Sequence, residues 1–192
     1  MPMNRNIVWM FAAALAFAPS ASAQMVVHAI SGKIKAINPA TKTVDVAAAD
    51  GSVNEFKLPS SHVQLDFSND LRSDSIEPDK FQHVGNFAVV YYYGYDANRT
   101  AVAIKDLGTG AFQKVYGTVV GYNKKDRQLT VKDAAGKTYT FTLSDHLIID
   151  NGLGVEDGRK YEGHKGAQVR VTYVPSGSQN SAVFVSSSAL SY

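Results

Sequence analysis

The chain has 192 residues, of which 19 are Lys or Arg and 17 are Asp or Glu, and it contains no cysteine. The lack of cysteine excludes a disulfide scaffold, a lipid-modified N-terminal cysteine and every site that needs a thiolate. A formal net charge of +2 gives the chain no electrostatic reason to bind nucleic acid or an anionic membrane.

The first 23 residues have the layout of a secretory signal peptide. Arg5 precedes an apolar run from Ile7 to Phe17, and Ala21-Ser22-Ala23 fits the small-x-small rule for signal peptidase. We expect cleavage before Gln24, which leaves 169 residues with a net charge of +1 and no transmembrane segment. The expected location is the periplasm or the exterior of the cell. A retained N-terminal anchor is the alternative.

The rest of the chain contains two copies of one pattern. Residues 32–38 align with residues 117–123 at an offset of 85, and the offset falls to 84 at His62 and His146 and to 81 further along. Loops of different length produce such a drift. We therefore divide the chain into a signal peptide (1–23), a first unit (24–108) and a second unit (109–192), with the repeats themselves over 26–108 and 112–188.

Each unit is predicted to consist of strands and turns. Runs rich in Val, Ile, Thr, Tyr and Phe alternate with turn clusters such as Asp50-Gly51 and Ala135-Gly136. After the signal peptide no run has the spacing of an amphipathic helix, apart from a helical turn in a long loop. Five short strands in about 80 residues suit a small barrel, because closure removes open sheet edges. We predict an all-β fold with two tandem barrels.

The strand pattern also supports a resemblance to known proteins. Residues 117–122, 128–132, 140–143 and 166–173 resemble exported bacterial OB-like repeats of unknown function, and more distantly the periplasmic OB-fold metallochaperones of copper and silver efflux. The resemblance covers each whole unit and consists of strand pattern and glycine placement. It implies small OB-like barrels of five strands each, and it speaks to the fold far more than to function.

The copper site of those metallochaperones is not carried over to this chain. The family holds Cu(I) with a histidine on the second strand, two methionines on the third strand and a nearby tryptophan. The only tryptophan here, Trp9, lies in the signal peptide, and Met25 is the only methionine after it. The matching strand positions carry Lys132 or Asp133 and then Lys137 and Tyr139 in the second unit, and Ala47 or Ala48 and then Ser52 and Asn54 in the first. We expect no cofactor.

Histidines that recur in the two units suggest a different metal site as an alternative. These residues are His62, His83, His146 and His164. If loops bring a pair together beside a carboxylate such as Asp66 or Asp150, the group would suit zinc or Cu(II). We favour the other interpretation, in which they are solvated loop residues retained from the duplication.

Catalytic and calcium-binding patterns are absent from the sequence. Ser144-Asp145-His146 holds the residue types of a hydrolytic triad, but adjacent residues point in divergent directions and a triad needs converging ones. The acidic loop from Ser68 to Lys80 has no glycine, which a calcium loop requires, so a solvated, mobile loop is expected. We predict that the protein is not an enzyme.

One strand of the first unit is apolar on both faces. Its outward face is predicted to carry Phe87, Val89, Tyr91, Tyr93 and, beyond the strand, Tyr95. We favour the hypothesis that this face packs on the second unit, where Tyr116, Val120 and Tyr122 would cover it. In the second hypothesis the same five residues form a docking face for an envelope protein, a peptide, a polysaccharide or a second protomer.

Together these observations predict an exported, non-enzymatic binding or structural protein of the bacterial envelope. Two OB-like barrels are expected to pack against each other, with the aromatic face either buried between them or offered to a partner. The alternative is a periplasmic metal-binding accessory protein that uses the repeated histidines.

Overall fold

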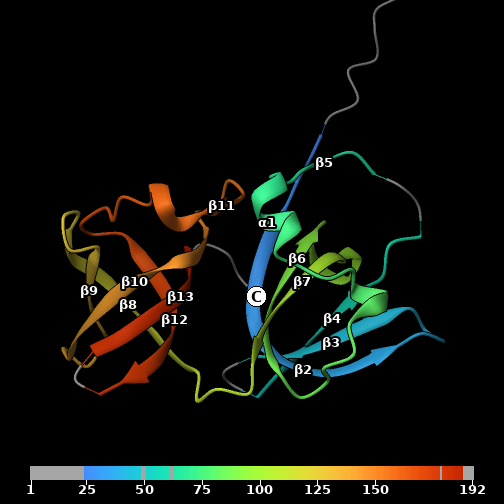
Figure 1. The fold of residues 1–192 in the computed structure, drawn as a ribbon, viewed down its shortest axis with the longest axis horizontal. Helices are drawn as coiled ribbons and strands as arrows, with labels where there is room; N and C mark the ends of the chain where they lie inside the picture. Colours follow the sequence, from blue (N-terminus) through green and yellow to red (C-terminus); the bar gives the residue numbers. More distant parts are fainter. Residues whose placement is uncertain (1–23, 49–50, 61–62, 178, 188–192) are drawn as a thin grey trace, which may run out of the picture.

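The computed structural model describes residues 24–48, 51–60, 63–177 and 179–187. The predicted signal peptide and His62 lie outside this part of the chain. The fold is all-β, with two small barrels beside each other (Figure 1). None of the helices in the described residues is long and apolar enough to cross a membrane.

The first barrel is closed by five strands in the spatial order β2-β3-β4-β7-β6. Only β4 and β7 run parallel, and they meet at one pair, Lys57 and Thr100. The strands are β2 (His28–Asn38), β3 (Thr43–Ala47), β4 (Val53–Lys57), β6 (Phe87–Tyr93) and β7 (Thr100–Gly108).

The second barrel repeats this arrangement with β8, β9, β10, β13 and β12 in the equivalent places. Their pairings form a closed ring in which only β10 and β13 run parallel. This is the five-stranded Greek-key arrangement of an OB-like barrel, and it confirms the predicted fold class. The strands are β8 (Gln113–Asn123), β9 (Gln128–Lys132), β10 (Thr138–Asp150), β12 (Gln168–Ser176) and β13 (Gln179–Ser187).

Short elements decorate the barrels and account for most of their differences. The first unit adds β1 (Met25–Val26), β5 (Leu65–Asp66), α1 (Asn69–Ser73), η1 (Pro78–Lys80) and η2 (Asp96–Asn98), and the second adds β11 (Val155–Asp157) and η3 (Gly158–Lys160). β1 and β5 pair with each other in parallel, and β11 pairs with the end of β10.

The two barrels share several backbone details. The turn before the fourth barrel strand is held in one unit by Gly85 N donating to Ile34 O and in the other by Gly166 N donating to Val119 O, both at 2.8 Å. Both glycines have positive φ, +97° and +91°. The first strand of each barrel is bulged at the same place, after Ile34 and after Val119.

A glycine at the bend of each first strand allows close contact with the second strand. A Cβ on Gly32 would lie 2.4 Å from Ala47 O, and a Cβ on Gly117 would lie 2.3 Å from Lys132 O. Real Cβ atoms do not approach oxygen this closely, so any larger residue must push the strands apart. The strong bend that closes each barrel therefore depends on glycine here.

Gly117→Ala is expected to lower the free energy of unfolding by about 1–3 kcal/mol, because the new methyl group overlaps the β9 backbone. Gly121→Ala on the same strand is the control, since its Cβ would lie 3.7 Å from Thr130 Cβ. That variant is expected to be neutral or slightly stabilising. Urea denaturation of both variants makes the comparison, and an equal effect would contradict the close-contact explanation.

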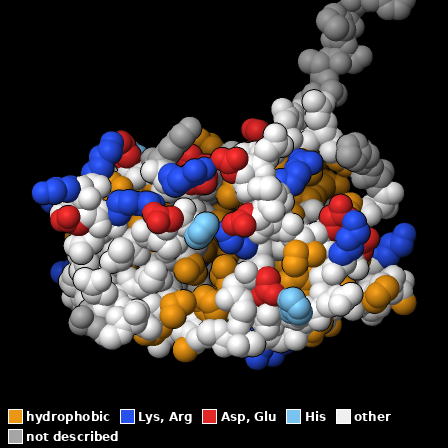
Figure 2. Space-filling view, in the orientation of Figure 1, with side chains coloured by type: hydrophobic (Ala, Val, Ile, Leu, Met, Phe, Trp, Pro, Cys, Tyr) orange, Lys and Arg blue, Asp and Glu red, His pale blue; other side chains and the backbone are white. Residues whose placement is uncertain are grey.

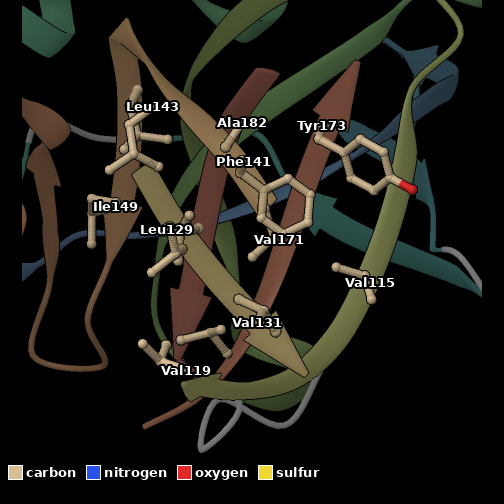
Figure 3. Close-up of a cluster of buried hydrophobic side chains, with 13 residues drawn as sticks. Val115, Val119, Leu129, Val131, Phe141, Leu143, Ile149, Val171, Tyr173 and Ala182 are labelled. Carbon is tan, nitrogen blue, oxygen red and sulfur yellow. The ribbon is translucent and has the colours of Figure 1, made fainter. Parts of the chain in front are cut away.

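Each barrel encloses its own hydrophobic core, drawn for the second barrel in Figure 3. Inward residues from all five strands meet there, as the alternating pattern predicts. An aromatic residue after a 3-10 turn contributes to each core, Phe81 after η1 and Tyr161 after η3. The inward set of the second barrel includes Val119, Leu129, Val131, Phe141, Leu143, Leu147, Ile149, Val171, Tyr173 and Ala182.

Candidate functional site

A third hydrophobic cluster lies between the two barrels. Its buried members are Val27, Ala29, Phe67, Leu71, Val89, Tyr91 and Ala103 from the first unit and Ile148 and Phe184 from the second. Residues of β2, β6 and β7 thus face residues of β10 and β13, while Phe67 and Leu71 come from the segment around α1. Because the cluster is continuous, the barrels share a core in addition to their own.

Strand β6 belongs to two cores at once. Ala88, Val90 and Tyr92 point into the first barrel, whereas Val89 and Tyr91 point into the third cluster. This division is the one that the alternating pattern predicts. The residues that were predicted to cover Val89 and Tyr91 do not do so, because Tyr116 and Val120 are 48% and 37% exposed.

Ile148 and Phe184 cover the β6 face in place of the three predicted residues. Tyr122 instead packs against the core of the second barrel, where its hydroxyl donates to Tyr161 O at 2.8 Å. The sequence pattern pointed to the first strand of the second unit because its aromatic residues are conspicuous. The covering residues lie in apolar runs in which inward and outward positions have the same composition.

The five residues of the predicted docking face are divided by the structure. Val89 and Tyr91 are fully buried and are therefore not accessible to a partner. Phe87 is half-buried and stacks on Phe112 with ring centroids 4.6 Å apart. Tyr93 is half-buried, and Tyr95 is 76% exposed.

Hydrogen bonds across the third cluster fix the relative position of the barrels. Asp150 Oδ2 accepts from Ala29 N at 2.8 Å, and Ser31 Oγ and Thr172 Oγ1 are 2.7 Å apart. Val155 N donates to Val27 O at 2.8 Å, so β11 continues the backbone bonding of one barrel into the other. Lys114 Nζ also donates to Ser31 O. Polar bonds and apolar contacts thus hold the same junction.

Asp150 is a buried carboxylate within this junction. Besides Ala29 N, it accepts from Gly152 N at 3.0 Å through Oδ1, and His28 Nδ1 lies 3.3 Å from Oδ2. Burial raises the pKa of Asp150 above its ordinary value, although both backbone N–H groups and His28 oppose that shift. The bonds to both oxygens explain how a carboxylate is tolerated at this depth.

The sequence pattern suggested Asp150 only as a metal ligand, and it did not point to His28. One available signal was the position of Asp150 directly after Leu147-Ile148-Ile149, because a carboxylate that ends a buried apolar run needs N–H donors. Gly152 is local, but Ala29 and His28 lie in a segment more than 120 residues away, so these two partners could not be read from the local sequence.

The hydroxyl of Tyr91 is a buried, unsatisfied polar group within the junction, with no hydrogen-bond partner among the described residues. Burial raises the pKa of this phenol far above its ordinary value, and the charges of Asp74 and Asp157 act in the same direction. The ring itself packs against Phe67 with centroids 4.9 Å apart.

Tyr91→Phe is expected to raise the free energy of unfolding by about 1–2 kcal/mol, because it removes a buried polar group without a partner and keeps the ring. Tyr91→Ala, which also removes the ring, is expected to lower it by about 3–5 kcal/mol. Thermal and urea denaturation compare the two. A clear loss of stability in Tyr91→Phe would indicate that the hydroxyl is bonded.

The acidic loop contains α1 and η1 and lies beside the junction, and most of its side chains are exposed, as expected of a solvated loop. Ser68 caps α1, accepting from Leu71 N at 3.4 Å, and Leu71 is buried in the third cluster. Arg159 of the second unit donates to Asp70 at 2.9 Å. In Figure 1, α1 lies beside β11 above the junction, and Figure 2 shows charged side chains of both signs over this region.

A cleft of about 710 Å³ opens on the first barrel beside β6 and β7. Phe67, Tyr93, Val102 and Ala103 contribute apolar surface, and Arg72 and Glu77 contribute one charge of each sign. Figure 2 shows hydrophobic side chains exposed in the region between α1 and β5. The remaining lining residues are Pro59, Ser60, Val63, Gln64, Leu65 and Ser75.

The structure does not gather the described histidines into a metal site. His83 Nδ1 lies 2.5 Å from Asp106 Oδ2, and His146 Nδ1 lies 3.8 Å from Asp74 Oδ2. His164 is exposed. Across the described ranges, no three His, Cys, Asp or Glu side chains lie together in a way that could hold a metal ion.

Ser144, Asp145 and His146 point to different partners. The guanidinium of Arg127 binds both the Asp145 carboxylate, at 2.9 Å, and the backbone oxygen of Ser144, at 3.2 Å. His146 faces Asp74 of the other unit. These contacts stabilise the irregular part of β10 between Leu143 and Ile148 and do not converge as the side chains of a triad do.

Comparisons with known proteins identify no family for this chain. No protein-family model and no curated protein matches it. Among solved structures, the Ag(I) form of CusF is similar with a TM-score of 0.31 and 18% identity, over 40% of this chain and 97% of that one. Drosophila Unr CSD456 is similar with a TM-score of 0.30 and 13% identity, over 84% of this chain and 60% of that one.

Proposed function

We propose that the protein is an exported, non-catalytic binding protein of the bacterial envelope, and that its two barrels form one rigid body with a ligand site beside β7. The observation that carries the proposal is the cleft of about 710 Å³. Its size falls within the usual range of ligand sites, and apolar and aromatic side chains with a few polar groups are typical of such sites.

The third cluster supports the rigid-body part of this proposal. Phe67 belongs to the cluster, where its ring packs on Tyr91, and it also lines the cleft together with Tyr93. A site built on packed strands keeps its shape when a ligand enters, so little binding energy is lost in ordering it. The second barrel therefore contributes to binding by fixing the first.

The export part of the proposal relies on the N-terminal sequence. Arg5, the apolar run and Ala21-Ser22-Ala23 predict cleavage before Gln24. Expression of the full chain in a Gram-negative host, followed by mass spectrometry of the envelope fraction, is expected to recover a protein that begins at Gln24. An intact N-terminus in the cytoplasmic fraction would contradict it.

A thermal-shift experiment tests the binding part. The exported chain is incubated with size-fractionated soluble material from the envelope, and Tm is measured for the wild type and for Val102→Lys, which places a charge in the cleft. A fraction that raises the Tm of the wild type by several degrees and leaves that of the variant unchanged is the expected result.

Two outcomes would overturn the proposal. If no fraction raises Tm, or if the rise is the same in the variant, the cleft is not a ligand site. If mass spectrometry shows that the active fraction is chemically converted during incubation, the protein is not a non-catalytic binder.

A further inference from the structure

Arg72 lines the cleft and pairs with no carboxylate in the part of the chain that the structure describes. It lies in the last turn of α1, within the acidic loop. Three carboxylates of this loop bind other cations instead, at 2.6 to 2.9 Å. These pairs are Asp70 with Arg159, Asp74 with Lys105 and Glu77 with Lys80. The acidic surroundings therefore leave Arg72 available to an anion from outside the chain.

The two charged residues of the cleft lining differ in this respect. Glu77 is compensated by Lys80, whose Nζ lies 2.6 Å from its carboxylate, whereas Arg72 has no such contact among the described residues. The uncompensated charge of the lining is therefore positive. A ligand that carries one negative charge complements the cleft better than a neutral or cationic one.

The guanidinium of Arg72 is supported by an aromatic ring. Its central carbon lies 5.4 Å from the centroid of Phe67, which is buried and packs on Tyr91 in the third cluster. This contact restrains a long side chain and thus lowers the entropy cost of binding through it. Because the N–H donors of a guanidinium lie in its own plane, contact with a ring face leaves donors for a carboxylate, which can accept two parallel bonds.

The rest of the apolar lining is mainly aliphatic. Tyr91 and Arg72 both contact the ring of Phe67, which restricts its use by a sugar or an aromatic ligand, and Tyr93 is half-buried. The aliphatic lining residues are Pro59, Val63, Leu65, Val102 and Ala103. An alkyl chain makes good contact with such a surface without needing a flat aromatic face.

We infer that the cleft binds a small amphipathic carboxylate, whose carboxylate pairs with Arg72 and whose single alkyl chain packs against Val102 and the other aliphatic lining residues. This inference rests on the proposed function and specifies its ligand class. The chain supplies most of the affinity, because each buried methylene group contributes to it. The ion pair selects the sign of the ligand charge and adds little affinity, since Arg72 is exposed.

Decanoate, below the concentration at which it forms micelles, is the probe. Hexanoate is the shorter control and decanol is the neutral control. Isothermal titration is carried out with the wild-type exported chain and with Arg72→Gln, Arg72→Lys, Val102→Asn and Lys137→Gln. Lys137 is the matched cation, because it also lies over a ring, 4.7 Å from the centroid of Tyr139, but belongs to the second barrel.

The wild type is expected to bind hexanoate at least about tenfold more weakly than decanoate, because four methylene groups are lost. Arg72→Gln is expected to weaken decanoate binding by about threefold to fivefold, the usual range for an exposed ion pair, and to leave decanol binding unchanged. Arg72→Lys keeps the charge and is expected to restore part of this loss. Lys137→Gln is expected to bind like the wild type.

Val102→Asn is expected to weaken both decanoate and decanol by about threefold or more, because it places an amide against the alkyl chain. Circular dichroism checks that this variant is folded, and Val102→Ala replaces it if it is not. Arg72→Gln changes an exposed side chain, so its result does not depend on that check.

Equal losses of decanoate and decanol binding in Arg72→Gln, or the same loss of decanoate binding in Lys137→Gln, would overturn the inference. Sedimentation with phosphatidylglycerol vesicles that requires Arg72, without decanoate binding, would also overturn it and assign the cleft to a membrane surface. Absence of decanoate binding together with a Tm shift by an envelope fraction that requires Val102 would overturn the ligand class and leave the proposed function standing. Absence of every signal would overturn both.

Discussion

Phe184→Ala is expected to lower the free energy of unfolding by about 3–5 kcal/mol, the usual cost of emptying a buried phenylalanine site. Phe184 is 1% exposed and belongs to the cluster between the barrels, not to the core of its own barrel. Its removal leaves Tyr91 and Ile148 without the partner on which they pack. The lost packing contacts are those that join the two units.

Urea denaturation measures this cost, and Phe112→Ala is the control. Phe112 is half-buried in the connection between the barrels and stacks on Phe87 alone among the aromatic pairs of the described chain. A loss of about 1–1.5 kcal/mol is expected for that variant. If Phe184→Ala costs no more than Phe112→Ala, the third cluster does not hold the barrels together.

Asp150→Asn is expected to cost about 2–4 kcal/mol, although it keeps the size of the side chain. The two carboxylate oxygens accept from Gly152 N and Ala29 N, and an amide can present oxygen to only one of them. The other N–H then faces an NH₂ group while buried, which leaves a buried donor unsatisfied. Asp66→Asn is the control, because Asp66 holds the equivalent position and is exposed.

The cost of Asp150→Asn is also expected to depend on pH. Since burial raises the pKa of Asp150 in the folded state, the unfolded chain releases this proton at lower pH than the folded protein does. The stability that Asp150 contributes is therefore complete below a pH of about 4 and decreases as the pH rises through the raised pKa.

Denaturation of the wild type and the variant near pH 4.5 and near pH 8 measures this dependence. We expect the difference between the two proteins to be larger near pH 4.5. Asp66→Asn is expected to change stability by less than about 0.5 kcal/mol at both values. A difference that grows with pH would show that N–H donors and His28 lower the pKa of Asp150 more than burial raises it.

The sequence predicted the barrels well because their determinants are local and repeated. Gly32 and Gly117, at an offset of 85, mark the same bend, and the alternation in β6 correctly separated Ala88, Val90 and Tyr92 from Val89 and Tyr91. Each of these features depends on contacts within one unit. Two copies of each signal made the pattern readable.

The junction could not be predicted in the same way because its contacts are nonlocal and differ between the copies. Ile148 and Phe184 correspond to Gln64 and Ala103 in the first unit, so no repeated signal marks them. The cleft also depends on a difference, namely that the segment around Leu65 leaves β7 while its counterpart stays on β13. Repeat comparison identifies what the two units share, whereas the junction and the cleft arise where the units differ.

The barrels meet through unlike faces, and such head-to-tail contacts generate open filaments when each unit still offers the complementary face. Here the faces at the two free ends do not match. The second barrel has Gln168 and Arg170 where the first has Phe87 and Val89, and the first has an exposed Gln64 where the second has Ile148. We therefore expect the contact between the barrels to be specific to this pair of faces and not to propagate from one molecule to the next.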